Sequence, residues 1–315
     1  MATVKMVETS ASSSSVSGTA KPPEKAVFLK EMIMTSSLLI GIMGLIGNGI
    51  VLCLFCYMCK NSRFFLYFQN IVFANIIVLI YVLVFFQRTC LHLDVKLHPL
   101  HLIEMLQTLG YNTRFYLLRT ICVERCLIIF WPVWNRRYRP RHMTFLVCAI
   151  LWSLSCLTSV VDNLACSADF TTTSEQFAIS CKNSSIMRIV IDLVIFLPLV
   201  IFSTLAILIR GQTQRVPLAR LDMIIMANVV LCILADTPIR IAHNIVYWLR
   251  GIDECLLTTT TQLFHSINSV ATLLIFVIVG CWKKTSEEPF FMFLERALEA
   301  EENMVQGREA DEQPV

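Results

Sequence analysis

Charged residues are scarce in this 315-residue chain, where Asp, Glu, Lys and Arg together make up 16%. A soluble domain of this length carries closer to ~25% charged residues. The shortage, together with 56% hydrophobic residues and a mean hydropathy of +0.66, indicates lipid rather than water as the main solvent. The net charge of +3 is small, and the basic residues are confined to short segments between apolar runs, which argues against a nucleic-acid partner.

Sequence features of enzymes and transporters are also missing. The chain shows no metal-ligand cluster and no nucleophile elbow, and none of its ten glycines lies in a phosphate-binding loop. It has no internal repeat of 20 to 50 residues, and its lone intramembrane charges form no pore stripe. We therefore expect neither an enzyme nor a transporter, and no cofactor.

Seven apolar segments are long enough to cross a bilayer, which takes about 20 residues. The third and sixth contain polar residues at intervals, as is typical of helices that line a polar cavity inside a bundle. The pattern predicts an all-α membrane protein, a seven-transmembrane helix bundle over residues 32–282. The predicted helices are Met32–Tyr57, Phe64–Phe86, Leu100–Phe130, Met143–Ala165, Ile186–Ile209, Met223–Leu249 and Leu263–Trp282.

Two polar tails flank this bundle. Residues 1–31 carry a Ser-rich stretch followed by two prolines, and we expect a disordered extracellular tail. Residues 283–315 form a cytoplasmic tail, in which Phe290–Leu298 predicts a short amphipathic helix along the membrane. Cys281 is either palmitoylated or a buried helix-end thiol.

The charges of the loops predict the orientation. Alternate inter-helix segments carry eleven and five Lys or Arg residues, and the richer set belongs in the cytoplasm. We therefore expect a multi-pass plasma-membrane protein with its N-terminus outside and a glycan on Asn183. Four cysteines then face the oxidising side, and four allow three pairings: Cys90, Cys166, Cys181 and Cys255.

The third helix ends in Glu124-Arg125-Cys126, and Pro132 follows seven residues after Arg125. An Arg at this depth can be held by its neighbouring carboxylate or released to meet a G-protein helix; the alternative is a snorkelling ion pair at the interface. Residues in other predicted helices stand at the positions typical of rhodopsin-like G-protein-coupled receptors, and they favour the first interpretation. They are Gly47-Asn48 with Val51, Trp152, Pro198 and Pro238.

A narrower resemblance is to the Mas-related receptors, from about Met32 to Leu298. The segments that carry it are Glu124-Arg125-Cys126-Leu127 with Trp131-Pro132-Val133-Trp134 and Arg139-Pro140-Arg141-His142, then Ser266-Ile267-Asn268-Ser269, then Leu294-Glu295-Arg296-Ala297-Leu298. The resemblance implies coupling to heterotrimeric G proteins and binding of a peptide or a cationic small-molecule ligand. The bundle itself would be in contact with membrane lipid. It also implies the Cys166–Cys181 disulfide, because these receptors lack a Cys at the outer start of the third helix and are bridged instead between the tops of the fourth and fifth helices, where these two cysteines stand.

The core polar network departs from the family pattern. Asn75 stands where rhodopsin-like receptors have the Asp that binds sodium, and Asn48 of the first helix is assigned to the same network. Arg114 stands where the same pocket usually has a small polar residue, and Asp236 where the family has Gly. A buried Arg is costly unless paired. We hypothesise that Arg114 replaces sodium and pairs with Asp236; the alternative is that Asp236 pairs with Arg240 at i+4.

The seventh helix departs most, because Thr272-Leu273-Leu274-Ile275-Phe276 lacks the Asn, Pro and Tyr of the usual activation motif. This loss supports an alternative function. The protein would be a seven-helix protein with constitutive or lost signalling that acts as a partner of another receptor, for example in a dimer.

Helical spacing predicts a ligand-binding face at the outer end of the third helix. Glu104 on this face is a candidate contact for a basic ligand, and so is Asp162, where the resemblance places an acidic, cation-recognising residue; both would use charge-assisted hydrogen bonds. Asp192 is a weaker candidate. The alternatives are an ion pair of Asp162 with Arg188 and a solvated rim position for Glu104. The remaining candidates on this face are Gln107, Thr108 and Tyr111.

Overall fold

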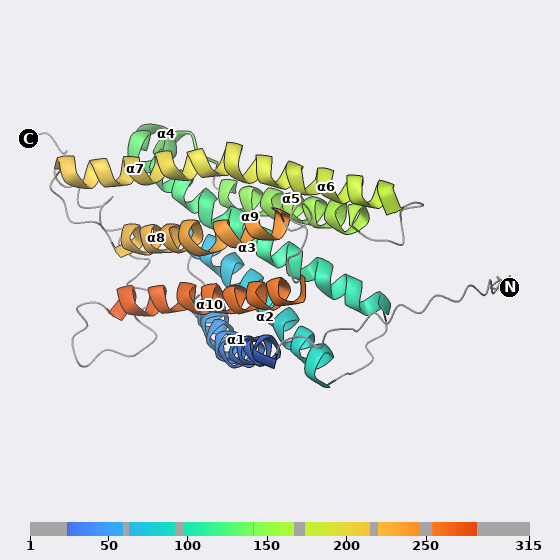
Figure 1. Cartoon of the computed structure of the whole chain (residues 1–315). Coiled ribbons are helices and arrows are strands. Elements are labelled where there is room, and N and C mark those ends of the chain that lie inside the picture. The colour runs from blue at the N-terminus through green and yellow to red at the C-terminus, as the bar shows by residue number, and fades with distance from the viewer. Residues whose placement is uncertain are drawn as a thin grey trace, which may run out of the picture.

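The computed structural model describes residues 24–58, 63–91, 97–140, 142–166, 174–214, 220–245 and 254–281, and it is helical with no strand over these ranges. Long helices lie side by side as a bundle (Figure 1). In chain order the elements are α1 Glu24–Met58, α2 Arg63–Leu91, α3 Leu97–Phe130, α4 Pro132–Arg137, α5 Met143–Ala165, α6 Ser174–Val190, η2 Ile191–Phe196, α7 Leu197–Gln214, α8 Arg220–Leu231, η3 Cys232–Asp236, α9 Thr237–Ile245 and α10 Glu254–Cys281.

Six of these helical rods are long and apolar enough to cross a membrane, with α6–η2–α7 and α8–η3–α9 each forming one rod. The seventh rod, α3, has 34 residues but also carries Arg114, Arg119, Glu124 and Arg125, all buried. It crosses the middle of the bundle obliquely and packs against α2, α5 and α7 (Figure 1). The seven-helix bundle predicted from the sequence is therefore confirmed.

Several helix ends differ from the prediction. The first, fifth and seventh rods begin at Glu24, Ser174 and Glu254, well before the predicted Met32, Ile186 and Leu263. Hydropathy misses these outer turns because they are polar, whereas helical hydrogen bonding continues through them. The short helix α4 was not predicted. Most of the tail predicted to be extracellular, and the segment Phe290–Leu298 predicted to form an amphipathic helix, lie outside the described residues.

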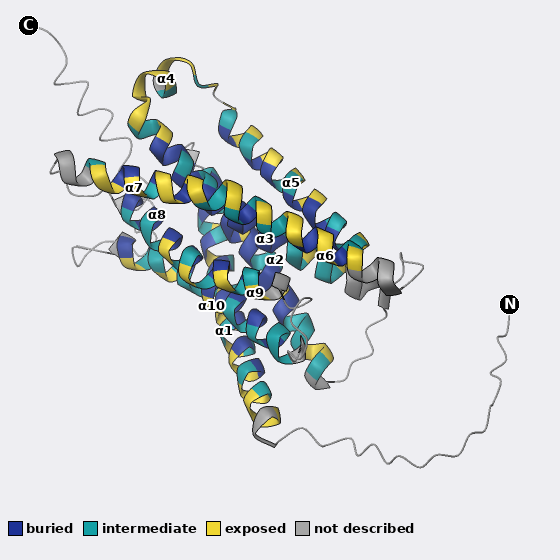
Figure 2. Cartoon of the chain, turned by 45° about the horizontal axis from the view of Figure 1, so that its top comes forward, coloured by how far each residue is buried: buried dark blue, intermediate teal, exposed yellow. Residues whose placement is uncertain are grey.

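Burial follows the pattern of a protein in lipid. Exposed positions lie along the outward faces of the helices and buried positions along the inward faces (Figure 2). Many exposed side chains are apolar, such as Leu39, Met43 and Phe145, whereas many polar side chains are buried. An apolar cluster that includes Phe68 and Phe276 fills much of the interior. Buried charges are costly in a bilayer and mark functional positions, so the interior polar groups are where a site is to be sought.

Two π-helical turns shape the polar interior, η2 just before Pro198 and η3 just before Pro238. Proline lacks an N–H and crowds the carbonyl of the preceding turn, and a π turn relieves this crowding locally. Each turn contains a buried carboxylate, Asp192 in η2 and Asp236 in η3. Because π turns often mark functional sites, these two residues anchor the description below.

Candidate functional site

Arg114 and Asp236 form an ion pair at the centre of the bundle. Arg114 Nη2 lies 2.8 Å from Asp236 Oδ1, and the two side chains are only 1% and 4% exposed. Arg114 Nη1 also donates to Ser269 Oγ at 3.3 Å, and Asn268 donates to the Asp236 carboxylate. Of the two partners considered for Asp236, the structure brings Arg114 to it, and the pair joins α3, η3 and α10.

The predicted neighbours of this pair continue the same hydrogen-bonded chain. Ser269 Oγ donates to Asn75 Oδ1 at 3.5 Å, and Asn75 Nδ2 donates to Asn48 Oδ1 at 3.3 Å. Asn48 in turn donates to the backbone oxygen of Gly44 at 2.8 Å. Arg114, Asp236, Asn75 and Asn48 therefore lie in one network, as the hypothesis of a guanidinium in place of sodium requires.

A second buried ion pair joins Arg240 of α9 to Asp192 of η2. Arg240 Nη1 donates to Asn112 Oδ1 at 2.7 Å, and its guanidinium carbon lies 4.5 Å from the centroid of the Phe115 ring. Asp192, a predicted ligand contact, is 4% exposed. Its carboxylate is therefore buried and already bound by Arg240.

Arg119 is a core residue that the sequence analysis missed. Its Nη1 donates to the backbone oxygen of Asp192 and its Nη2 to Thr237 Oγ1, each at 3.4 Å, and its guanidinium carbon lies 3.4 Å from the Phe115 ring centroid. It thereby connects η2 to the residue that follows η3. The available signal was an Arg within an otherwise apolar segment, two turns from Arg125.

Asp162, near the end of α5, pairs with Arg188 at 2.6 Å and also accepts a hydrogen bond from Ser184. The ion pair considered as an alternative to ligand contact is thus formed. One turn further out, Cys166 and Cys181 form the predicted disulfide, which ties α5 to α6. The side chains of the other two outer cysteines are not among those described, and Asn183 is exposed on α6.

Other predicted ligand contacts on α3 differ in position. Glu104 lies at the rim, 39% exposed, with its carboxylate 4.0 Å from Arg88. Gln107 Nε2 donates to Gln262 Oε1 at 3.1 Å. The hydroxyl of Tyr111 donates to the backbone oxygen of Asp236 at 3.4 Å. Thr108 donates to its own helix, at the Glu104 backbone oxygen, so among these three uncharged residues Gln107 and Tyr111 hydrogen-bond to other helices.

At the opposite end of the bundle, Arg125 reaches across to Asp222 at the start of α8. Arg125 Nε lies 2.5 Å from Asp222 Oδ1 and Nη2 lies 3.3 Å from Oδ2, with side-chain exposures of 7% and 11%. Glu124 forms an ion pair with Arg139, after the short helix that Pro132 begins. The sequence analysis missed Asp222, because nothing in its local pattern names a partner 97 residues away.

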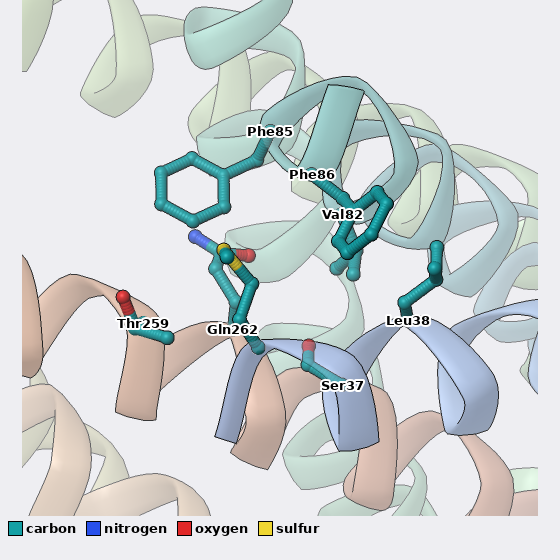
Figure 3. Close-up of a pocket in the computed structure, with 8 residues that line it drawn as sticks. Ser37, Leu38, Val82, Phe85, Phe86, Thr259 and Gln262 are labelled. Carbon is teal, nitrogen blue, oxygen red and sulfur yellow. The ribbon is translucent and has the colours of Figure 1, made fainter. Parts of the chain in front are cut away.

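A narrow crevice without room for a water molecule lies between α1, α2 and α10 (Figure 3). No charged residue lines it. Its walls are Met34, Ser37, Leu38, Val82, Phe85, Phe86, Thr259 and Gln262. Within the described ranges, no group of three or more His, Cys, Asp or Glu is placed to hold a metal ion.

Comparison with known proteins agrees with this architecture. The family model described as "Serpentine type 7TM GPCR chemoreceptor Srx" matches residues 38–210. The proto-oncogene Mas of Rattus norvegicus is 30% identical over 287 residues, which is 89% of this chain and 85% of that protein. The Mas-related G-protein coupled receptor member X2 of Homo sapiens is 28% identical over 277 residues, 83% of this chain and 81% of that one. The chain therefore belongs to the family of Mas and the Mas-related G-protein-coupled receptors.

Proposed function

We propose that this receptor activates heterotrimeric G proteins through Arg125 when a peptide or a cationic small molecule binds at the other end of the bundle. The observation that carries this proposal is the ion pair between Arg125 of α3 and Asp222 of α8. While it holds, it ties the two helix ends together and occupies Arg125. Its release frees the guanidinium for a G-protein helix.

The arrangement of the two ends supports a plasma-membrane receptor with its N-terminus outside. The disulfide and the exposed Asn183 lie at one end, where an oxidising compartment and glycosylation are expected. Arg125, Arg139 and the basic helix α4 lie at the other, as cytoplasmic segments require.

Ion pairs at three levels connect the sixth rod, α8–η3–α9, to the rest of the bundle. We propose that these pairs stabilise the resting state of the receptor. Asp222 is bound to Arg125, Asp236 to Arg114, and Arg240 to Asp192. The middle pair takes the place of sodium and the top pair lies beneath the predicted ligand face. In this receptor an agonist acts by weakening these pairs, which compensate for the missing activation motif of the seventh helix.

For ligand recognition we assign Asp162 as the cation-binding carboxylate. A ligand cation must take the place of Arg188, because removing one member of a buried pair leaves an unpaired charge. Arg188 is 14% exposed and can swing outward when displaced. Asp192 is buried more deeply beneath Arg240, and Glu104 lies at the solvated rim, so both are weaker candidates.

The ligand assignment predicts that Asp162→Asn weakens a cationic agonist by roughly tenfold or more, since a charge-assisted hydrogen bond contributes about 1.5–3 kcal/mol. The agonist is first selected on the native receptor from a library of Arg- and Lys-containing peptides, and its potency is then measured in cells. Glu104→Gln is the matched control at the rim and should change the potency little. An Asp162→Asn receptor that reaches the surface with native potency contradicts the assignment.

The alternative function is a receptor-like protein with constitutive or lost signalling that pairs with another receptor. What favours it is the seventh helix, where Thr272 donates only to its own helix, at the Asn268 backbone oxygen, and Phe276 packs against Phe68. This segment contributes an apolar contact where related receptors have a polar switch.

Arg125→Ala separates these functions. In the proposed receptor, the variant reaches the surface and loses agonist-stimulated G-protein activation. A high basal signal that the substitution abolishes indicates constitutive coupling. No signal from the native receptor under any peptide, with normal surface expression, favours the silent partner and contradicts the proposal. The measurement is G-protein dissociation in cells, with surface receptor quantified in parallel.

A further inference from the structure

Arg119 is a buried cation without a carboxylate of its own. The residue is 3% exposed, and in the described part of the chain no carboxylate forms an ion pair with it. Its guanidinium donates to the Asp192 backbone oxygen and to Thr237 Oγ1, each at 3.4 Å, and lies over the Phe115 ring. Neutral acceptors and an aromatic ring lower the cost of burying a guanidinium but do not cancel its charge. An acid that paired with Arg119 would therefore stabilise it.

Asp192 is the acid that Arg119 already touches. Its Oδ2 is held by Arg240, whereas its Oδ1 is buried and accepts no hydrogen bond from any described residue. Arg240 has other contacts besides this carboxylate. It donates to Asn112 Oδ1 at 2.7 Å, and its guanidinium carbon lies 5.2 Å from the centroid of the Tyr111 ring. Asp192 is thus next to two guanidiniums, with one carboxylate oxygen engaged and the other unused.

The two guanidiniums belong to different helical rods. Arg119 is in α3, Arg240 is in α9 of the sixth rod, and Asp192 is in η2 of the fifth. Both guanidinium carbons lie close to the same ring, at 3.4 and 4.5 Å from the Phe115 centroid. We propose that Asp192 exchanges its cation: it binds Arg240 while the receptor is at rest and Arg119 when α9 moves away.

The exchange makes the release of the sixth rod less costly, and in this respect it rests on the proposed function. A buried ion pair that loses one member leaves an uncompensated charge, which is strongly destabilising. With Arg119 as the second partner, the Asp192 carboxylate is neutralised in both states, and η2 is bound to α3 in place of α9. Arg119 already contacts the Asp192 backbone, so the exchange takes place by rotation of side chains while α3 stays in place.

The test is a mutant cycle on the thermal stability of the full-length receptor in nanodiscs, without ligand or G protein. In Arg240→Gln the carboxylate re-pairs with Arg119, and in Arg119→Gln it keeps Arg240, so each single variant should lose little. The double variant leaves Asp192 without a cation, and its melting temperature should fall by roughly 5 °C or more beyond the sum of the single effects. Tryptophan fluorescence follows unfolding, and surface expression in cells is scored in parallel.

Two controls identify the carboxylate as the cause. Adding Asp192→Asn to the double variant removes the unpaired charge and should recover most of the excess loss. Arg119→Gln combined with Arg139→Gln, which breaks the ion pair of Glu124 instead, should show additive effects. If Arg119 only holds the helices together, the Arg119→Gln and Arg240→Gln effects add and Asp192→Asn recovers nothing, and either result overturns the exchange.

A separate measurement distinguishes this failure from a failure of the proposed function. Arg240→Gln should raise ligand-free G-protein activation about tenfold per surface receptor, because the contact that it removes holds the sixth rod at rest. Arg240→Lys keeps the charge and should stay closer to the native signal. A native signal from Arg240→Gln, together with a non-additive thermal cycle, counts against the proposed function and leaves the exchange of partners supported.

Discussion

Asp222→Asn is expected to raise basal G-protein activation roughly ten- to a hundredfold. The substitution keeps the shape of the side chain but removes the charge that holds Arg125 across the bundle. A hydrogen bond to a charged group contributes about 1.5–3 kcal/mol, and each 1.4 kcal/mol is a factor of ten in an equilibrium. Loss of this contact therefore shifts the population toward the open inner end. The measurement is ligand-free G-protein dissociation, normalised to surface receptor.

Two companion variants establish the cause of that increase. Asp222→Glu keeps the charge and should stay near the native basal signal. The double variant Asp222→Asn with Arg125→Ala should return to background, because the group that engages the G protein is gone. A native basal signal from well-expressed Asp222→Asn would show that the Arg125–Asp222 pair does not hold the receptor at rest.

The helices of this fold were predictable because lipid imposes a simple rule on them. Each span needs about 20 apolar residues with all backbone groups bonded internally, and hydropathy detects that directly. Helix ends were less predictable: Ser174 begins a rod twelve residues before the predicted Ile186, since polar outer turns are invisible to hydropathy. The disulfide between Cys166 and Cys181 was identified by family resemblance, because the spacing of the cysteines alone left three pairings open.

Contacts in the site could be predicted only for buried charges, because an isolated charge inside the membrane is so costly that a partner of opposite charge must be present. Arg114 on an apolar helix required an acid, and Asp236 was one of few available. Local spacing nevertheless also allowed Asp236 to pair with Arg240, and the choice depends on helix rotation at η3, a π turn that no sequence rule anticipated. Asp222 was missed for a related reason, because its partner Arg125 is distant in sequence and near only after the bundle packs.

The Arg114–Asp236 pair predicts the largest effect on folding. Arg114→Asp or Asp236→Arg alone places two like charges together at a site that is 1–4% exposed. Breaking a buried pair costs about 3–5 kcal/mol, which is a large share of the stability of a typical domain. Each single variant should therefore lose most of its surface expression, measured by antibody staining of an N-terminal tag on intact cells.

The double variant Arg114→Asp with Asp236→Arg restores opposite charges and should recover a substantial part of that expression. The matched control makes the same two kinds of charge change but in different ion pairs. Arg114→Asp combined with Asp192→Arg leaves Asp236 without a positive partner, so surface expression should not recover. Asn268, which donates to Asp236, would face a guanidinium in the rescued protein, so full recovery is not expected. Absence of any rescue by the double variant, against clear loss in both singles, would show that this pair is not what neutralises Arg114 in the membrane.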